Sequence, residues 1–276
     1  MTRRAVTIWA VAYGALRVWY ATGHAPNWKL PGDDLLIPNW VSVVACLLTA
    51  VAVIRIRPRL LWVLAAGWLA AAAFILLDVV AGILPGLGIP FDALGMLSRL
   101  GAIVGAVLLG LLARTRQAPA APWPAWVAIA GACLATAGCL IRLGAQAVVG
   151  FEQTPYAGSL SLIIFEGGFL LAGTLLPFLL VHRIGRFFPR WMLLLPGYLI
   201  GAGMTAYFSV GLIQMIVAAI QGEPVYGDVG LPDSFFWVSV PAYVVWGAGL
   251  TAATRGYQLA TRKTNDSQCD PRVTQR

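Results

Sequence analysis

Apolar residues along this chain fall into eight long runs, separated by short segments that carry most of its charges. An α-helix needs about 20 apolar residues to cross a hydrocarbon core of roughly 30 Å, and most of the runs approach or exceed that length. None shows the alternation of membrane β-strands, and only helices satisfy their own backbone hydrogen bonds in lipid. The pattern therefore predicts an all-α, polytopic membrane helix bundle of about eight transmembrane helices. The predicted spans are residues 5–23, 40–54, 60–84, 96–113, 123–149, 159–181, 191–221 and 235–257.

The composition supports a chain embedded in lipid. Of its 276 residues, 59% are hydrophobic and 11% are charged, whereas soluble domains have roughly 25% charged residues. The net charge of +8 could indicate a nucleic-acid partner. However, the basic residues occur in short clusters between apolar runs, and therefore no nucleic acid is expected to bind.

The basic residues outside the spans indicate how the chain crosses the membrane. Fifteen of these sixteen residues lie on the side that holds both termini, and Lys29 lies on the other side. Positively charged loops stay in the cytoplasm, so the sequence predicts a multi-pass plasma-membrane protein with both termini cytoplasmic. The preference for arginine over lysine fits a GC-rich bacterial genome. Arg17 interrupts the first apolar run, which is therefore interpreted as a retained span and not as a signal peptide.

Short motifs recur at similar positions in the two halves of the chain. Their offsets are 125, 131 and 142 residues, as expected when loops lengthen along the second copy. An even number of spans in each copy would make the two copies parallel. We therefore predict a four-helix half at 1–118, a second at 119–263 and a disordered cytoplasmic tail at 264–276. The paired motifs are 14–17 with 138–142, 57–59 with 188–190, and 88–90 with 230–232.

The first span contains the sequence Leu-Arg-Val-Trp-Tyr-Ala-Thr-Gly at 16–23, followed by a loop rich in Pro and Trp. This motif resembles small uncharacterised actinobacterial membrane proteins, which are four-span domains of unknown function, some of them in tandem. The second half departs from the motif, because Arg142 is kept but the Trp-Tyr pair is replaced by Leu143 and Gly144. The resemblance implies a fold and no activity.

Five ionisable residues lie inside the predicted spans: Arg17, Asp78, Arg99, Arg142 and Glu166. Such residues are costly in lipid and mark either function or a buried partner. At about 1.5 Å per residue, most of them lie roughly 9–12 Å below the outer membrane boundary. Their common depth predicts an outward-facing polar pocket. Other polar residues expected near this level are Gln146, Tyr207, Ser209 and Gln214.

A structural role would account for these charges through two ion pairs, Arg142 with Glu166 and Arg17 with Asp78. Loss of one partner of a buried pair costs about 3–5 kcal/mol, so stability alone could retain both pairs.

A functional role is favoured by departures from the predicted symmetry. The two arginines of these pairs recur in both halves, whereas Asp78 aligns near Ser209 and Glu166 aligns near Asn39. Neither acid therefore has an acidic counterpart, as expected for groups with a specialised task.

With three arginines and two acids, the predicted pocket would be slightly positive. Guanidinium groups bind carboxylates and phosphates through paired hydrogen bonds, which suggests binding or transport of a small amphiphilic or anionic ligand such as a lipid headgroup. Membrane lipids are the expected partners, and the sequence identifies no protein partner. The predicted ligand-binding residues are Arg17, Arg99, Arg142, Gln146, Tyr207 and Gln214.

Two further hypotheses belong to other classes of function. In the first, an intramembrane cyclase or isomerase would use Asp78 and Glu166 as acids toward a lipid-like substrate. In the second, the chain is a non-catalytic partner or immunity subunit of a membrane assembly. The aromatic residues considered for stabilising a cation in the enzyme are Trp62, Trp68, Phe74, Phe165, Tyr207 and Phe208.

Neither a cofactor nor a metal is expected. His24 and His182 are predicted on opposite sides of the membrane, and no nucleotide-binding motif or nucleophile elbow is present. The acidic residues of the outer loops are interpreted as solvated charge and not as a cation site. They include Asp33, Asp34, Glu223, Asp228 and Asp233.

Small residues in the spans have a simpler interpretation. Gly101 with Gly105 and the small residues of 131–138 are typical of surfaces where helices pack closely. Pro177, Pro196 and Pro241 would permit kinks.

Overall fold

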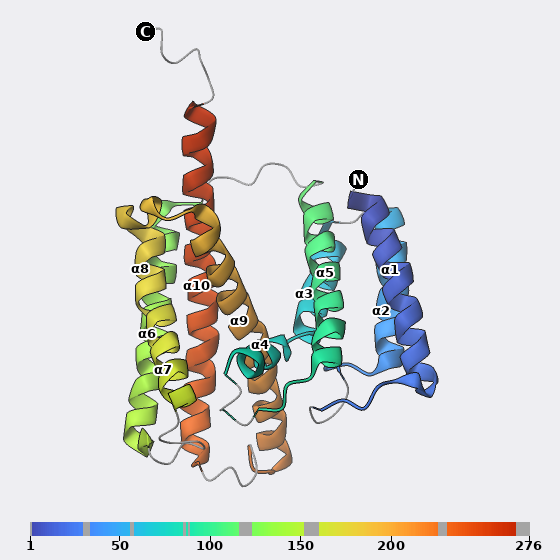
Figure 1. Ribbon diagram of the computed structural model, residues 1–276, viewed down its shortest axis with the longest axis horizontal. Helices are drawn as coiled ribbons and strands as arrows, with labels where there is room; N and C mark the ends of the chain where they lie inside the picture. The colour runs from blue at the N-terminus through green and yellow to red at the C-terminus, as the bar shows by residue number, and fades with distance from the viewer. Residues whose placement is uncertain are drawn as a thin grey trace. The chain divides into compact units, whose positions relative to one another are not determined.

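The computed structural model describes residues 2–29, 34–55, 58–84, 87, 89–115, 123–151, 160–225 and 231–268. These residues are helical or irregular, and no strand occurs among them (Figure 1). Helices lie at all eight predicted positions. Five of those described are long and apolar enough to cross a membrane, or six if one bent pair is counted as a single span.

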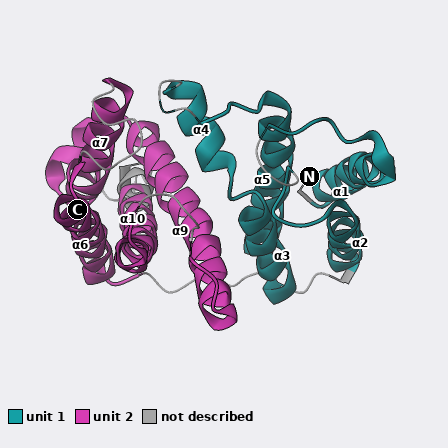
Figure 2. Cartoon of the chain, turned by 90° about the horizontal axis from the view of Figure 1, so that it is seen from below, with its two compact units in different colours: residues 1–120 teal, residues 121–276 magenta. Residues whose placement is uncertain are grey.

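The chain divides into two compact units, residues 1–120 and 121–276 (Figure 2). The division lies next to the predicted boundary between residues 118 and 119. The helix α10 continues through Gln268, which is inside the predicted tail, and residues 269–276 lie outside the described part of the chain. Each unit is described below by itself.

In unit 1, α1 (Thr2–Trp19) packs against α2 (Asn39–Arg55) and α5 (Ala93–Arg114). Helix α3 (Pro58–Ala71) also packs against α5. A π-helical turn, η1, continues α1, and α4 follows α3 after a short break. The elements are α1 (Thr2–Trp19), η1 (Tyr20–His24), α2 (Asn39–Arg55), α3 (Pro58–Ala71), α4 (Ile75–Ile83) and α5 (Ala93–Arg114).

The predicted span 60–84 is not one continuous helix. It bends by 42° between α3 and α4, at residues 72–74. In an unbroken helix the Ala71 carbonyl would accept the hydrogen bond of the Ile75 N–H. Here that carbonyl accepts from the Leu36 N–H at 3.0 Å, and the Ile75 N–H donates to Ala72 instead. The non-helical segment before α2 therefore takes over a backbone acceptor at the end of α3.

Aromatic rings and glycines form the interface of α1 with α3 and α5. The ring centroids of Trp9, Tyr13 and Trp68 lie 5.3–5.6 Å apart. The Trp9 indole N–H donates to the Gly101 carbonyl at 2.8 Å. A Cβ atom at Gly101 or Gly105 would overlap Tyr13 or Trp9, respectively. These glycines therefore pack helices together, as predicted.

In unit 2, α10 is the central helix and packs against α6, α8 and α9. The predicted sixth span is divided at Thr174 into α7 and α8, and a 3-10 turn, η4, leads to α9. The elements are α6 (Ala125–Val149), α7 (Leu160–Gly173), α8 (Leu175–Val181), η4 (Arg183–Phe187), α9 (Arg190–Gln221) and α10 (Asp233–Gln268).

Glycines allow α10 to approach the backbone of both neighbouring helices. A Cβ atom at Gly138 of α6 would lie 2.5 Å from the Ala242 carbonyl oxygen, and one at Gly249 would lie 2.6 Å from the Gly131 oxygen. On the other side, a Cβ atom at Gly247 would lie 2.7 Å from the Thr205 nitrogen. Because the obstructing atoms belong to the backbone, these contacts leave no room for a side chain.

Many large apolar side chains are exposed, and several charged side chains are buried, which is unusual for a soluble protein. Large apolar side chains on the outer faces of both units are exposed, such as Ile8, Val63, Ile163 and Leu195. The fully buried side chains include arginine and aspartate, which are described below. Such an arrangement is compatible with helices that face hydrocarbon.

We predict that Gly138→Ala destabilises the protein and Gly144→Ala does not. The added methyl group of Gly138→Ala must displace the α10 backbone, at a cost of about 1–3 kcal/mol. Nothing lies within 4 Å of the corresponding position at Gly144 in the same helix, where alanine should stabilise by about 0.5–1 kcal/mol. Thermal unfolding in detergent, followed by tryptophan fluorescence, compares the two. If the two variants unfold at the same midpoint temperature, the close packing of Gly138 against the α10 backbone is contradicted.

Candidate functional site

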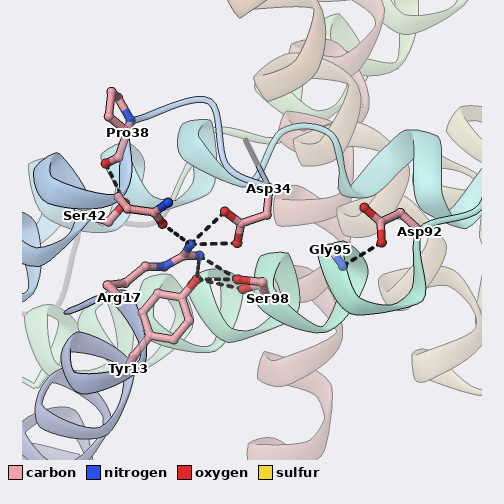
Figure 3. A network of polar contacts seen from close by, with 9 residues as sticks. Tyr13, Arg17, Asp34, Pro38, Ser42, Asp92, Gly95 and Ser98 are labelled. Carbon is pink, nitrogen blue, oxygen red and sulfur yellow. Dashed lines mark hydrogen bonds and ion pairs between the residues drawn. The ribbon is translucent and has the colours of Figure 1, made fainter. Parts of the chain in front are cut away.

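Arg17, near the C-terminal end of α1, lies at the centre of a buried polar network (Figure 3). Its Nη1 donates to both carboxylate oxygens of Asp34, at 2.8 and 2.7 Å, and to Asn39 Oδ1 at 3.1 Å. Its Nη2 donates to the Tyr13 hydroxyl at 2.5 Å and to Ser98 Oγ at 2.6 Å. The guanidinium group therefore joins α1, α2, α5 and the segment before α2.

The interpretation of Asp34 as solvated loop charge is wrong, and so is the predicted pairing of Arg17 with Asp78. Asp34 is buried, as is the adjacent Leu35. The segment turns inward because Leu35 packs in the core of unit 1 and Leu36 bonds to the end of α3. This brings the Asp34 carboxylate to Arg17.

Asp78 pairs with Arg99, and not with Arg17. Arg99 Nη1 donates to Asp78 Oδ2 at 2.6 Å, and both side chains are completely buried. The Arg99 guanidinium carbon also lies 5.8 Å from the centroid of the Phe74 ring, at the break between α3 and α4. Because Ser98 and Arg99 are consecutive, α5 contacts both ion pairs of unit 1.

The Arg99–Asp78 pair leaves hydrogen-bonding atoms unused. Arg99 Nε and Nη2 and Asp78 Oδ1 are buried, and none has a hydrogen-bond partner among the described residues. Nε and Nη2 form one edge of the guanidinium group, which is the edge that binds a carboxylate or phosphate with two parallel hydrogen bonds. In Arg17 and Arg142, by contrast, only Nε lacks a partner. Of these three buried arginines, Arg99 alone has an edge of two nitrogens without a partner in the described part of the chain.

A third carboxylate, Asp92, lies beside this pair. It caps α5 by accepting from the Gly95 N–H at 3.0 Å, and it also accepts from the Lys29 N–H at 3.1 Å. A Cβ atom at Gly95 would lie 2.6 Å from Asp92 Oδ2 and 3.0 Å from Arg99 Nη1, so only glycine fits between them. Among the described buried side chains in this part of unit 1, three carboxyl groups accompany two guanidinium groups, an excess of one acidic group.

Unit 2 contains the predicted pair of Arg142 with Glu166. Arg142 Nη2 donates to Glu166 Oε1 at 2.6 Å, and Nη1 donates to Oε2. The two side chains are 7% and 19% exposed, so this pair is more accessible than those of unit 1. Gln146 lies one turn away and is buried, and its Oε1 lacks a partner within the described chain.

An aromatic cluster lies against Arg142 through the ring of Tyr243. The Arg142 guanidinium carbon lies 5.7 Å from the Tyr243 ring centroid, and Phe208 stacks on Tyr243 at 4.0 Å. The predicted residue Tyr207 contacts Phe208 at 5.0 Å, whereas Gln214 is exposed farther along α9. Tyr243 is not among the residues predicted from the sequence, and neither are Phe169 and Trp246, which pack against it.

The structure divides the predicted site residues between the two units. Arg17, Asp78 and Arg99 belong to unit 1, with the unpredicted Asp34, Asp92, Tyr13 and Ser98. The predicted residues of unit 2 are Arg142, Gln146, Glu166, Tyr207 and Gln214. A single pocket shared by all of them stays a prediction. A signal for Asp34 was present in the sequence, because an acid directly followed by Leu-Leu-Ile is unusual for a solvated loop.

The enzyme hypothesis gains no specific support from these contacts. Each of its two proposed acids, Asp78 and Glu166, is held by an arginine. In the described ranges, no group of three His, Cys, Asp or Glu side chains could hold a metal ion. Of the aromatic residues proposed to stabilise a cation, Trp68 instead packs against Trp9 and Tyr13.

Comparison with known proteins finds no match to this chain among protein families, curated proteins or solved structures.

We predict that Asp34→Asn strongly destabilises the protein. It removes the countercharge of a buried guanidinium group, which should cost about 3–5 kcal/mol. Glu223→Gln makes the same chemical change at an exposed residue and should leave stability unchanged. Thermal unfolding of the two variants in the same detergent measures the difference. If Asp34→Asn unfolds at the wild-type temperature, Arg17 does not depend on this carboxylate.

Proposed function

We propose that this chain is an eight-span protein of a bacterial plasma membrane that binds a small amphiphilic or anionic ligand in the outer half of the membrane. Both termini would lie in the cytoplasm, and the spans would form a parallel 4+4 repeat. Such an architecture agrees with the resemblance to tandem four-span actinobacterial proteins. The ligand would bind at Arg99 and Asp78.

The positions of the shorter helices support the count of eight. Five long apolar helices and the bent pair α3–α4 would supply six spans. The apolar helix α2 and the helix α1 with its continuation η1 would supply the others. The basic residues outside the spans, except Lys29, then fall on one side of the membrane, as the positive-inside rule predicts.

Equivalent contacts in the two units support the repeat. The sequence motifs align Arg17 with Arg142 and place Asn39 near Glu166. Arg17 donates to Asn39, and Arg142 donates to Glu166, so each arginine reaches the equivalent position of the following helix. In both units the first predicted span packs against the second and the fourth, and the third packs against the fourth.

The free edge of Arg99 is the observation that carries the proposal of ligand binding. Two buried N–H groups without a partner cost several kcal/mol unless an acceptor is supplied. A carboxylate, phosphate or carbonyl group would supply one acceptor region for both. Asp78 Oδ1 could accept a hydrogen bond from a hydroxyl or ammonium group of the same ligand. The excess negative charge nearby favours a monoanionic or zwitterionic headgroup over a multivalent anion.

The other two arginines would have structural roles. Both terminal nitrogens of Arg17 and of Arg142 already donate to protein acceptors. A ligand could bind them only by displacing a carboxylate or a hydroxyl group. At Arg99, a ligand could bind Nε and Nη2 without displacing a described protein acceptor.

The break between α3 and α4 supplies a route by which the buried site could open. Asp78 lies on α4, a helix of nine residues that is separated from α3 by the bend. Broken spans at binding sites are a recurring feature of transporters. Movement of α4 would expose the free edge of Arg99 without disturbing the Arg17 network, which supports transport as well as binding.

We predict that the double variant Arg99→Gln/Asp78→Asn loses a bound small molecule that the wild-type protein retains. The two substitutions neutralise the pair together, so neither charge is left buried alone. Native mass spectrometry of protein purified in mild detergent from its expression host would detect the bound mass, which chromatography of an organic extract would identify.

The matched control is Arg17→Gln/Asp34→Asn, which makes the same change at the pair with saturated terminal nitrogens. It should keep the bound molecule. Wild-type protein without any bound molecule would contradict the proposal, as would equal retention by the Arg99 variant.

We also predict the orientation of the loops from the positive-inside pattern. Alkaline phosphatase should be active when it is fused within 30–33 or 152–159, and inactive within 116–122 or at the C-terminus. Green fluorescent protein fused at the same positions should give the opposite pattern. An active phosphatase within 116–122 would require an odd number of spans in the first half.

A further inference from the structure

Four arginines lie at the end of unit 2 where α9 begins. Arg183 and Arg186 lie on η4, Arg190 begins α9, and Arg255 lies on α10. No carboxylate side chain is described on these parts of η4, α9 and α10. The acids of unit 2 whose side chains are described are Glu166 within α7, Glu223 after the end of α9 and Asp233 at the start of α10, and Asp266 lies on α10 eleven residues beyond Arg255.

Two of these arginines converge on Gln258. Arg255 Nη1 donates to Gln258 Oε1 at 2.7 Å, and Arg190 Nη2 donates to the Gln258 carbonyl oxygen at 3.5 Å. The Tyr198 hydroxyl also donates to Gln258 Oε1, at 2.8 Å. Both arginines are partly buried, and Arg190 Nε is buried without a partner among the described residues. Two positively charged side chains therefore donate to the same neutral residue. A bound anion would offset the repulsion between them.

The turn beside these arginines is held firmly against α10. The Tyr257 hydroxyl donates to the Gly185 carbonyl at 3.2 Å. A Cβ atom at Gly185 would lie 1.9 Å from the Leu179 carbonyl oxygen, so η4 packs against the end of α8 without space for a side chain. Arg190 therefore extends from a fixed backbone.

Exposed apolar side chains adjoin the arginines. Phe187 is 88% exposed and Trp191 is 67% exposed, next to the first turn of α9. Farther along α9, Met192, Leu195 and Leu199 are exposed at helical spacing. Aromatic residues are typical of the membrane–water interface, and an apolar stripe below it can contact an acyl chain. The cluster thus combines a polar end for a headgroup with an apolar surface for a lipid tail.

We propose that Arg190 and Arg255 bind the phosphate of an anionic phospholipid at this end of unit 2. Two guanidinium groups from different helices match the oxygens of a phosphodiester, and basic pockets between helices are known to hold anionic headgroups. Phe187 and Trp191 would lie at the headgroup level, and the lipid tail would follow the exposed stripe of α9. This site shares no residue with the site at Arg99 and Asp78 and is independent of it.

The test is a lipid titration of delipidated full-length protein, followed by native mass spectrometry. The probes are dioleoyl phosphatidylglycerol and dioleoyl phosphatidylcholine. We expect the first phosphatidylglycerol molecule to bind wild-type protein at least about tenfold more tightly than phosphatidylcholine. The variant Arg190→Gln/Arg255→Gln should lose this preference. Glycerophosphoglycerol, the free headgroup, should not displace the lipid at equal concentration, because it lacks the tail.

The matched control is Arg183→Gln/Arg186→Gln, which removes the same charge from exposed positions on the same turn. It should change the affinity of the first phosphatidylglycerol molecule by less than about threefold. Equal loss in both variants would show that net charge alone attracts the lipid and would overturn the site. Equal binding of the two lipids by the wild type, or displacement by the free headgroup, would also overturn it.

If the glutamine variant does not fold, a variant that keeps both charges tests the same binding site. Arg190→Lys/Arg255→Lys keeps both charges but removes the paired donors. It should bind phosphatidylglycerol several-fold more weakly than wild type, and unchanged affinity would overturn the assignment.

Discussion

Pairing of buried guanidinium groups with carboxylates is the interaction on which this structure depends. The described helices expose apolar side chains and bury Arg17, Arg99 and Arg142, each beside one carboxylate. An unpaired charge in such surroundings would cost several kcal/mol. Each pair also joins separate segments: α1 to the segment before α2, α4 to α5, and α6 to α7. The same charges that are costly to bury therefore fix which segments lie together.

The three arginines differ in what remains after this pairing. Arg17 and Arg142 use both terminal nitrogens on protein acceptors, as expected of residues that hold the bundle together. Arg99 uses only one, and among the described residues its Nε and Nη2 and the Asp78 Oδ1 have no hydrogen-bond partner. The three arginines carry the same charge, but they differ in how many of their donor nitrogens already have an acceptor among the described residues. It distinguishes one candidate for ligand binding among residues that are chemically alike.

The positions of the helices could be predicted from the sequence because the thickness of a membrane dictates the length of an apolar run. The Arg142–Glu166 pair could be predicted because its residues lie at similar depth in consecutive spans. Asp34 could not be assigned by residue type, because its burial depends on the inward turn of a non-helical segment. The break after α3 could not be predicted either, because residues 72–74 are Ala-Ala-Phe and contain neither glycine nor proline. It coincides with a hydrogen bond from the Leu36 N–H, which is distant in the sequence.

Electron cryo-microscopy of the protein in lipid nanodiscs would test the central claim most directly, at a resolution that shows side chains and bound waters. We expect density larger than a water molecule, and continuous with an elongated molecule, against Nε and Nη2 of Arg99 and Oδ1 of Asp78. If these atoms instead contact another protein group or a single ordered water, Arg99 has the same structural role as Arg17 and Arg142, and the proposed binding site does not exist.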